Sequence, residues 1–201
     1  MYHERVAIFI DGAYLDKLME LEFDRTRIMF DRFVAAIAGT DAVLRTYYYH
    51  CPPYIGHAPT DNDNRRADAK DRFFSALSSL PRFQLRLGKL VYRGLDESNK
   101  PIFVQKLVDI MLGVDLVLLS ATRQITKAVL VAGDSDFIPA VVAAKQQGVV
   151  VALWHGPTRT TNHSTVHKDL WDACDDRFEI TQQLVDQVRN KQHNGSDQNG
   201  Q

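Results

Sequence analysis

The chain has 201 residues, of which 45% are hydrophobic, so it is long enough for one sizeable core and favours a single domain. Its 24 Lys and Arg residues are balanced by 25 Asp and Glu residues, and the net charge of -1 excludes a globally basic nucleic-acid-binding protein. Any surface for a polyanion must therefore be a local patch. We expect one domain over residues 1–190 and a disordered polar tail over 191–201, which has almost nothing to bury.

Short apolar runs alternate with segments of helical periodicity. In chain order the pattern predicts a strand at 6–10, helices at 15–22 and 27–38, a strand at 43–50, a helix at 68–80, a strand-like segment at 82–93, a helix at 104–120, a strand at 128–132, a helix at 137–148 and a strand at 149–153. This alternation predicts an α/β fold, a three-layer α/β/α sandwich with a mainly parallel central sheet. Ligands of such folds gather beyond the carboxyl ends of the strands.

The segment 82–93, RFQLRLGKLVYR, changes its apolar phase at Gly88, which predicts a β-bulge or a break there. Arg82, Arg86, Lys89 and Arg93 make it cationic without a single acid. Two interpretations stay open, a solvated strand face and a face that contacts phosphates.

Cysteine usage and hydropathy bear on the compartment. Cys51 and Cys174 belong to no CxxC pair, which is typical of a reducing compartment. No apolar run has the length of a signal peptide or a membrane span, so we expect a soluble cytoplasmic protein. His163 and His167 are spaced i, i+4, but no Glu or Cys completes a ligand set, and we do not expect zinc there.

Aspartates follow two of the predicted strands. Asp11 ends the run IFID, and Asp134 and Asp136 follow the run AVLVAG. If these strands are neighbours, the carboxylates meet at one edge of the sheet, where like charges raise one another's pKa unless a cation neutralises them. The alternative is that Asp134 or Asp136 caps the helix that begins near Phe137, which explains one aspartate but not three.

The predicted helix 104–120 supplies a further acid. Lys106 and Asp109 fall on a narrow polar stripe of a segment that is otherwise apolar, so we expect the helix to be buried on most sides. A carboxylate in such a helix must be paired, with Lys106 as the candidate, or bound to metal. Asp115 points roughly opposite to the stripe and is expected to be structural.

A set of aspartate ligands that includes no His or Cys suits Mg²⁺ or Mn²⁺, because these hard cations prefer oxygen ligands. Asp11, Asp109 and Asp134, supported by Asp136, would hold one or two such ions for displacement at phosphorus. The sequence contains no Ser-His-Asp signal, no GxxxxGK[ST] loop and no GxGxxG after a strand. Metal-assisted phosphodiester hydrolysis is therefore the leading chemistry.

Five blocks in this order closely resemble the NYN domain, in its bacterial LabA-like branch, a relative of PIN-domain and flap-type nucleases: IFIDGAYLD, RTYYYH, QKLVDIMLGVDLV, AVLVAGDSDFIPAV and CDDRFEIT. The resemblance covers roughly residues 4 to 182. It implies a PIN-like sandwich whose acidic pocket binds a divalent metal for ribonuclease activity.

By position, the metal-binding acids of the family match Asp11, Asp109 and Asp134, with Asp136 as the second acid of the GDSD block. The resemblance also implies that Ser135 bonds to a metal-bound water or a phosphate, and that Lys106 orients the helical carboxylate or meets a phosphate. The family's opening motif often reads DGxN, whereas this chain has Tyr14 at the Asn position, a side chain that could stack on a base or donate from its hydroxyl.

The leading hypothesis is a Mg²⁺- or Mn²⁺-dependent ribonuclease acting on single-stranded or loop regions of RNA. Arg65, Arg66 and Lys70, with Arg86 and Lys89 of the cationic segment, would guide the RNA backbone. The tyrosines at 47–49 and 54 are expected in the core or sheet, with a stacking face for bases as the alternative.

Two other hypotheses stay open. One is a non-catalytic RNA-binding or regulatory module with a structural metal site, and the other is a metal phosphatase with a closed pocket for a small nucleotide. Many compact α/β domains of this size dimerise, so a homodimer is a further expectation.

Overall fold

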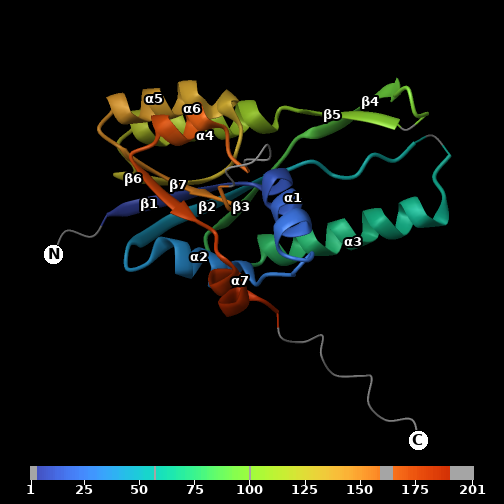
Figure 1. Ribbon diagram of the computed structural model, residues 1–201, viewed down its shortest axis with the longest axis horizontal. Coiled ribbons are helices and arrows are strands. Elements are labelled where there is room, and N and C mark those ends of the chain that lie inside the picture. The colour runs from blue at the N-terminus through green and yellow to red at the C-terminus, as the bar shows by residue number, and fades with distance from the viewer. Residues whose placement is uncertain (1–3, 57, 100, 159–164, 191–201) are drawn as a thin grey trace, which may run out of the picture.

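The computed structural model describes residues 4–56, 58–99, 101–158 and 165–190. The predicted tail 191–201 and His163 lie outside the described residues. The centre of the fold is a six-stranded sheet whose pairs are all parallel, in the order β3-β2-β1-β6-β7-β8 (Figure 1). Its strands are β1 (Arg5–Asp11), β2 (Ala42–His50), β3 (Phe83–Leu87), β6 (Lys127–Val131), β7 (Val150–His155) and β8 (Asp176–Glu179).

Helices cover both faces of the sheet, so the predicted three-layer α/β/α sandwich is confirmed (Figure 1). One face carries α1 (Gly12–Glu22), α2 (Phe30–Ala38), α3 (Asp61–Ser78) and α7 (Gln182–Val188). The other carries α4 (Val108–Ala121), α5 (Ile138–Gln146) and α6 (Lys168–Ala173). None of the helices in the described ranges is long and apolar enough to cross a membrane.

The central strand β1 explains why two cores form. Ala7 and Phe9 pack under α4 and α5, while Val6, Ile8 and Ile10 pack under α1 and α2, and all five are fully buried. A parallel strand covered on both faces needs apolar residues at every position, which is why the run VAIFI is continuous rather than alternating.

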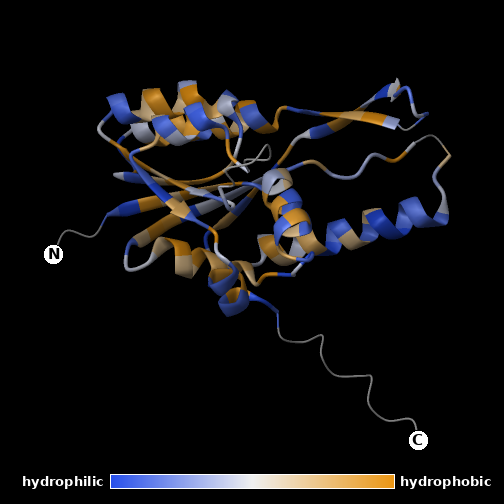
Figure 2. Cartoon of the chain, viewed as in Figure 1, coloured by the Kyte–Doolittle hydropathy of each residue, from blue (hydrophilic) through white to orange (hydrophobic). Residues whose placement is uncertain are grey.

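The chain leaves the sheet at Gly88, which confirms the predicted break. A Cβ atom at this position would lie 2.3 Å from the carbonyl oxygen of Lys106, so only glycine allows the two segments to approach so closely. Beyond it, β4 (Lys89–Leu95) pairs antiparallel with β5 (Pro101–Lys106) in a separate two-stranded hairpin. This hairpin and α3 extend from the same side of the domain (Figure 1), and Figure 2 shows that the projecting part of α3 is mostly hydrophilic.

The predicted helix 104–120 was wrong in two respects. Residues 104–106 belong to β5, because pairing with β4 overrides their helical pattern, and Leu107 in a left-handed conformation (φ 76) separates them from α4. Lys106 is therefore not one helical turn before Asp109. The helix is also not buried on most sides, since Ile110 and Val114 are 66% and 57% exposed.

Candidate active site

The carboxyl edge between β1 and β6 holds the first two predicted acids. These strands are neighbours, with Ile10 opposite Val131, and the strand order reverses between them, which is where open α/β sheets bind ligands. Asp11 ends β1, and Asp134 follows β6 by three residues. The prediction that two adjacent strands deliver these aspartates to one edge is confirmed.

Both side chains are fixed by backbone amides. Asp11 caps α1, and its Oδ1 accepts hydrogen bonds from the N–H groups of Ala13 and Tyr14 at 3.0 and 3.1 Å. Asp134 caps the short 3₁₀ turn Ser135–Phe137 by accepting from the Asp136 N–H at 3.1 Å, whereas the α-helix that follows from Ile138 has no side-chain cap. The Ser135 hydroxyl donates to the same Oδ1 at 3.5 Å.

Asp109 connects the acids into one electrostatic cluster from the first turn of α4. The pKa of Asp11 is raised to about 6, chiefly by burial and also by the charge of Asp109, while the hydrogen bonds from the backbone oppose this rise. Partial burial also raises the pKa of Asp109, followed by repulsion from Asp134 and Asp136. The charges of both acids of the GDSD block thus raise the pKa of Asp109, and the charge of Asp109 raises the pKa of Asp11.

The donor chemistry of this cluster fits a hard divalent cation in an open site. Within the described part of the chain, no three His, Cys, Asp or Glu side chains are placed to hold one ion together. Mg²⁺, however, is usually bound by one or two carboxylates, with water and substrate phosphates completing its shell. The arrangement therefore suits a partly hydrated ion rather than a closed cage of protein ligands.

A hollow of about 640 Å³ opens beside Asp11 and Asp134. Its rim carries Lys17 from α1 and Lys168 from α6, two cations that the sequence reasoning missed. Lys17 lay in a predicted helix, but only the fold shows that this face of the helix borders the acids. Lys168 pairs with Asp172, and its neighbour His167 caps α6 by accepting from the Asp169 N–H at 3.2 Å.

Tyr14 forms one wall of this hollow. Its hydroxyl accepts a hydrogen bond from the Gly156 N–H at 2.9 Å, and burial raises its pKa. Its ring lies against Gly133, where a Cβ atom would be only 2.5 Å from the ring. Tyr14 therefore links α1 to the segments after β6 and β7, and a direct contact with RNA stays a prediction.

Three polar side chains near Asp11 were not predicted to act together. Lys70 donates to Asp16 Oδ2 at 2.9 Å, and His50 Nε2 lies 3.0 Å from the same oxygen. Burial raises the pKa of Asp16, but His50 and Lys70 outweigh it, so the pKa lies below its ordinary value. The side chain of Lys70, expected to guide RNA, is held by this ion pair.

Arg86 was predicted to contact phosphate, but the structure assigns it a different partner. Its Nε donates to Asp115 Oδ2 at 2.8 Å, the Tyr49 hydroxyl donates to the same oxygen at 2.9 Å, and its guanidinium lies over the Tyr47 ring. This network joins the sheet to α4 and confirms the structural role predicted for Asp115.

The remaining predicted cations are exposed. Arg65 and Arg66 lie on α3, and Lys89 and Lys106 are directly opposite each other at the base of the β4–β5 hairpin. No ion pair joins Lys106 to Asp109 among the described residues, so the alternative in which Lys106 neutralises Asp109 finds no support.

No curated protein matches the chain. A solved protein of unknown function from Vibrio parahaemolyticus is 18% identical, with a TM-score of 0.64 over 94% of this chain and 97% of that one. The catalytic domain of CheB methylesterase from Thermotoga maritima is 14% identical over 94% and 100% of the two chains, but its TM-score of 0.37 is too low to indicate a shared fold.

The Vibrio protein shows a similar fold and carries no information on activity. The NYN domain model, by contrast, matches residues 5–181, which is most of the chain and includes all four candidate acids. That domain suggests the PIN-like nuclease superfamily. The chain therefore belongs to the NYN domain family.

Proposed function

We propose that this protein is a cytoplasmic Mg²⁺- or Mn²⁺-dependent ribonuclease of the LabA-like branch that hydrolyses phosphodiester bonds in single-stranded or looped RNA. The observation that supports the proposal is that Asp11 and Asp134 follow neighbouring strands where the strand order reverses, and that Asp109 is electrostatically coupled to Asp11, Asp134 and Asp136. Like charges held at one edge are costly unless a cation or partner neutralises them.

Each acid has a position suited to holding the ion. Asp11 and Asp134 are oriented by backbone N–H groups before any ion arrives, so little rearrangement is needed on binding. Asp109 and Asp136 approach from α4 and the 3₁₀ turn. The bound ion would supply Lewis-acid stabilisation at phosphorus and lower the pKa of a water ligand.

The neighbouring residues would position the substrate. Lys17 and Lys168 on the rim of the hollow attract the phosphate and offset its repulsion from the aspartates. Ser135, which donates to Asp134, keeps that carboxylate facing the hollow or bonds to a phosphate oxygen. Tyr14 lines the hollow and is held there by the hydrogen bond that its hydroxyl accepts from the Gly156 N–H.

The test is cleavage of a labelled mixed-sequence single-stranded RNA, and of matched DNA, with Mn²⁺, Mg²⁺ or EDTA. We expect metal-dependent cleavage of RNA by wild type and none by Asp134→Asn, with RNA binding retained. The control is Asp31→Asn in the first turn of α2, which removes one carboxylate outside the proposed site and should leave cleavage unchanged.

Two outcomes would count against the proposal. Cleavage that persists in Asp134→Asn would show that the acids are assigned wrongly. RNA binding without cleavage by folded wild type, under any of the metals, would favour the non-catalytic RNA-binding or regulatory module.

A further inference from the structure

The β4–β5 hairpin carries a cluster of exposed aromatic rings. Tyr92 and Phe103 are directly opposite on the two strands, and their ring centroids are 5.9 Å apart. Tyr54, from the segment after β2, lies 6.1 Å from Tyr92 and 5.3 Å from Phe103. The three residues are 38–41% exposed, so this cluster offers solvent a large apolar and aromatic surface.

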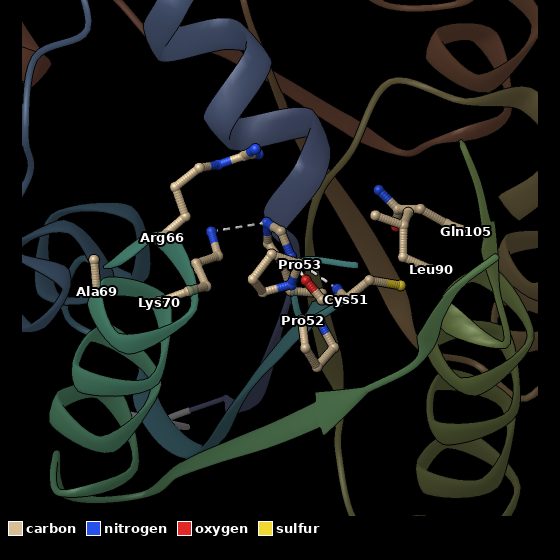
Figure 3. Close-up of a pocket in the computed structure, with 9 residues that line it drawn as sticks. Cys51, Pro52, Pro53, Arg66, Ala69, Lys70, Leu90 and Gln105 are labelled. Carbon is tan, nitrogen blue, oxygen red and sulfur yellow. Dashed lines mark hydrogen bonds between the residues drawn. The ribbon is translucent and has the colours of Figure 1, made fainter. Parts of the chain in front are cut away.

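The same face of the hairpin forms one wall of a cavity of about 460 Å³, a size within the range of roughly 300–1,000 Å³ for ligand pockets. Side chains alternate along a strand, so Leu90 and its partner Gln105 share the face of Tyr92 and Phe103. Figure 3 shows Leu90 and Gln105 on one side of the cavity and Arg66 and Lys70 of α3 on the other. Cys51, Pro52 and Pro53 lie between the two walls.

The floor of this cavity adjoins the acidic cluster. The pKa of the Cys51 thiol is raised by burial and then by the charges of both Asp109 and Asp11, so Cys51 lies within electrostatic reach of two proposed metal ligands. Asp16, which pairs with the cavity residue Lys70, lies on α1, the helix that Asp11 caps. The cavity and the acids are therefore neighbours, since Gly88 lies against both the cavity residue Cys51 and Val108, the residue before Asp109.

Charge on the hairpin and α3 points to an anionic ligand. Lys89 and Lys106 are directly opposite on neighbouring strands, an arrangement that destabilises a hairpin unless an anion lies between them. Arg65 and Arg66 add two exposed cations on α3. A groove that combines cations with exposed aromatic rings is the feature by which proteins bind single-stranded nucleic acid.

We propose that the cleft between α3 and the β4–β5 hairpin binds consecutive unpaired nucleotides of RNA and leads the strand to the acids; this inference rests on the proposed function. Bases stack on Tyr54, Tyr92 and Phe103, and phosphates meet Arg66 from α3 and the Lys89–Lys106 pair at the base of the hairpin. A base in a duplex already stacks on its neighbours, so the cleft selects single-stranded over fully paired RNA.

Binding is measured by fluorescence anisotropy of a short fluorescein-labelled single-stranded RNA in EDTA, where cleavage does not interfere. Tyr92→Leu and Phe103→Leu keep an apolar side chain but remove the aromatic face, and each should weaken binding about tenfold. Tyr92→Phe keeps the ring and should bind like wild type. The control, Phe178→Leu, removes an aromatic residue that is 42% exposed on β8, the opposite edge strand of the sheet, and should have no effect.

A second variant tests the charged wall without altering the hairpin. Arg66→Gln on the surface of α3 should weaken binding and reduce the slope of log affinity against log salt by about 1. The melting temperature of every variant shows whether it is folded. A fully paired duplex of the same sequence should bind more weakly than the single strand to wild type.

Different experimental results would overturn the RNA-binding cleft and the proposed nuclease activity. Wild-type binding by Tyr92→Leu, Phe103→Leu and Arg66→Gln, each folded, would overturn the cleft while leaving cleavage by the acids intact. A change in the oligomeric state of the leucine variants with unchanged RNA affinity would also overturn it, since a second copy of the chain would then cover the rings. If these variants bind RNA more weakly but wild type cleaves no RNA, the result would support the cleft and count against the proposed nuclease activity.

Discussion

Asp11 at the end of β1 and Asp109 in the first turn of α4 are electrostatically coupled, although 98 positions separate them in the chain: the charge of Asp109 raises the pKa of Asp11. Burial contributes more to this shift than Asp109 does, and together they outweigh two stabilising hydrogen bonds. The metal-free protein therefore contains a carboxylate whose ionisation costs folding free energy.

Asp11→Asn should stabilise the metal-free protein in a pH-dependent way. The folded-state pKa of about 6 lies above the ordinary value of 3.8, so the folded state keeps a proton that the unfolded state releases between these values. The free energy of unfolding of wild type therefore falls as pH rises through this window, by about 3 kcal/mol at most. Asparagine still accepts the amide hydrogen bonds but does not ionise.

The measurement is urea unfolding in EDTA at several values from pH 4 to 7.5. The free energy of unfolding of the variant should increase relative to that of wild type as pH rises through the window. Above the window the difference should stay constant. A stability difference that is the same at every pH would contradict the coupling.

Added Mg²⁺ or Mn²⁺ should raise the melting temperature of wild type, because an ion that binds only the folded state stabilises it. At ten times its dissociation constant the ion contributes about 1.4 kcal/mol, or about 3–6 °C for a chain of this size. Asp109→Asn should lose most of this response, and Asp31→Asn should keep it. No shift in wild type at millimolar metal would argue against a metal site at these acids.

Arg86→Gln should affect stability and not RNA affinity. The substitution leaves the half-buried Asp115 without its cation and perturbs the Tyr49 bond, at a cost of about 1–3 kcal/mol. Urea unfolding measures the loss, and anisotropy with labelled RNA measures the affinity. A stable variant with weakened RNA binding would restore the phosphate-contact role that the sequence predicted.

Tyr14→Phe should also act through stability. Without the hydroxyl, the Gly156 N–H loses its acceptor, at a cost of about 1 kcal/mol, while the ring still fills the space beside Gly133. Thermal unfolding and the cleavage rate are measured on the same preparation. A large fall in cleavage with unchanged stability would show that the hydroxyl acts on the substrate.

Much of the sheet was predictable because its strands are marked by patterns within short stretches of sequence. The runs that form β1, β6 and β7 are continuous and apolar, and the change of phase at Gly88 marks the end of β3. Residues 104–106 were assigned to a helix because nothing local shows that β4 would pair with them. The four-residue β8, in which three residues are charged, is too short and too polar to give a pattern.

In the candidate site, too, the positions of some residues follow from the local sequence, while those of others depend on contacts between distant segments. Asp11 and Asp134 follow strand-like runs, so a parallel sheet places both at its carboxyl edge, and the pairing of β1 with β6 makes them neighbours there. Asp16, His50 and Lys70 come together across 34 and 54 positions, and no spacing in the sequence predicts that contact. The ion pair of Arg86 was missed for the same reason, since its partner Asp115 lies 29 positions away on α4.

The most direct test of the acidic cluster as a catalytic metal site is the rate of RNA cleavage in Mn²⁺ by wild type and Asp134→Asn, measured with enzyme in excess so that all the RNA is bound. Asparagine at this position still accepts the Asp136 N–H bond, so the fold and the RNA cleft should persist. We expect cleavage by wild type that EDTA abolishes, and none by the variant at equal RNA occupancy. Equal cleavage by both proteins would contradict the assignment of the acidic cluster as the catalytic metal site.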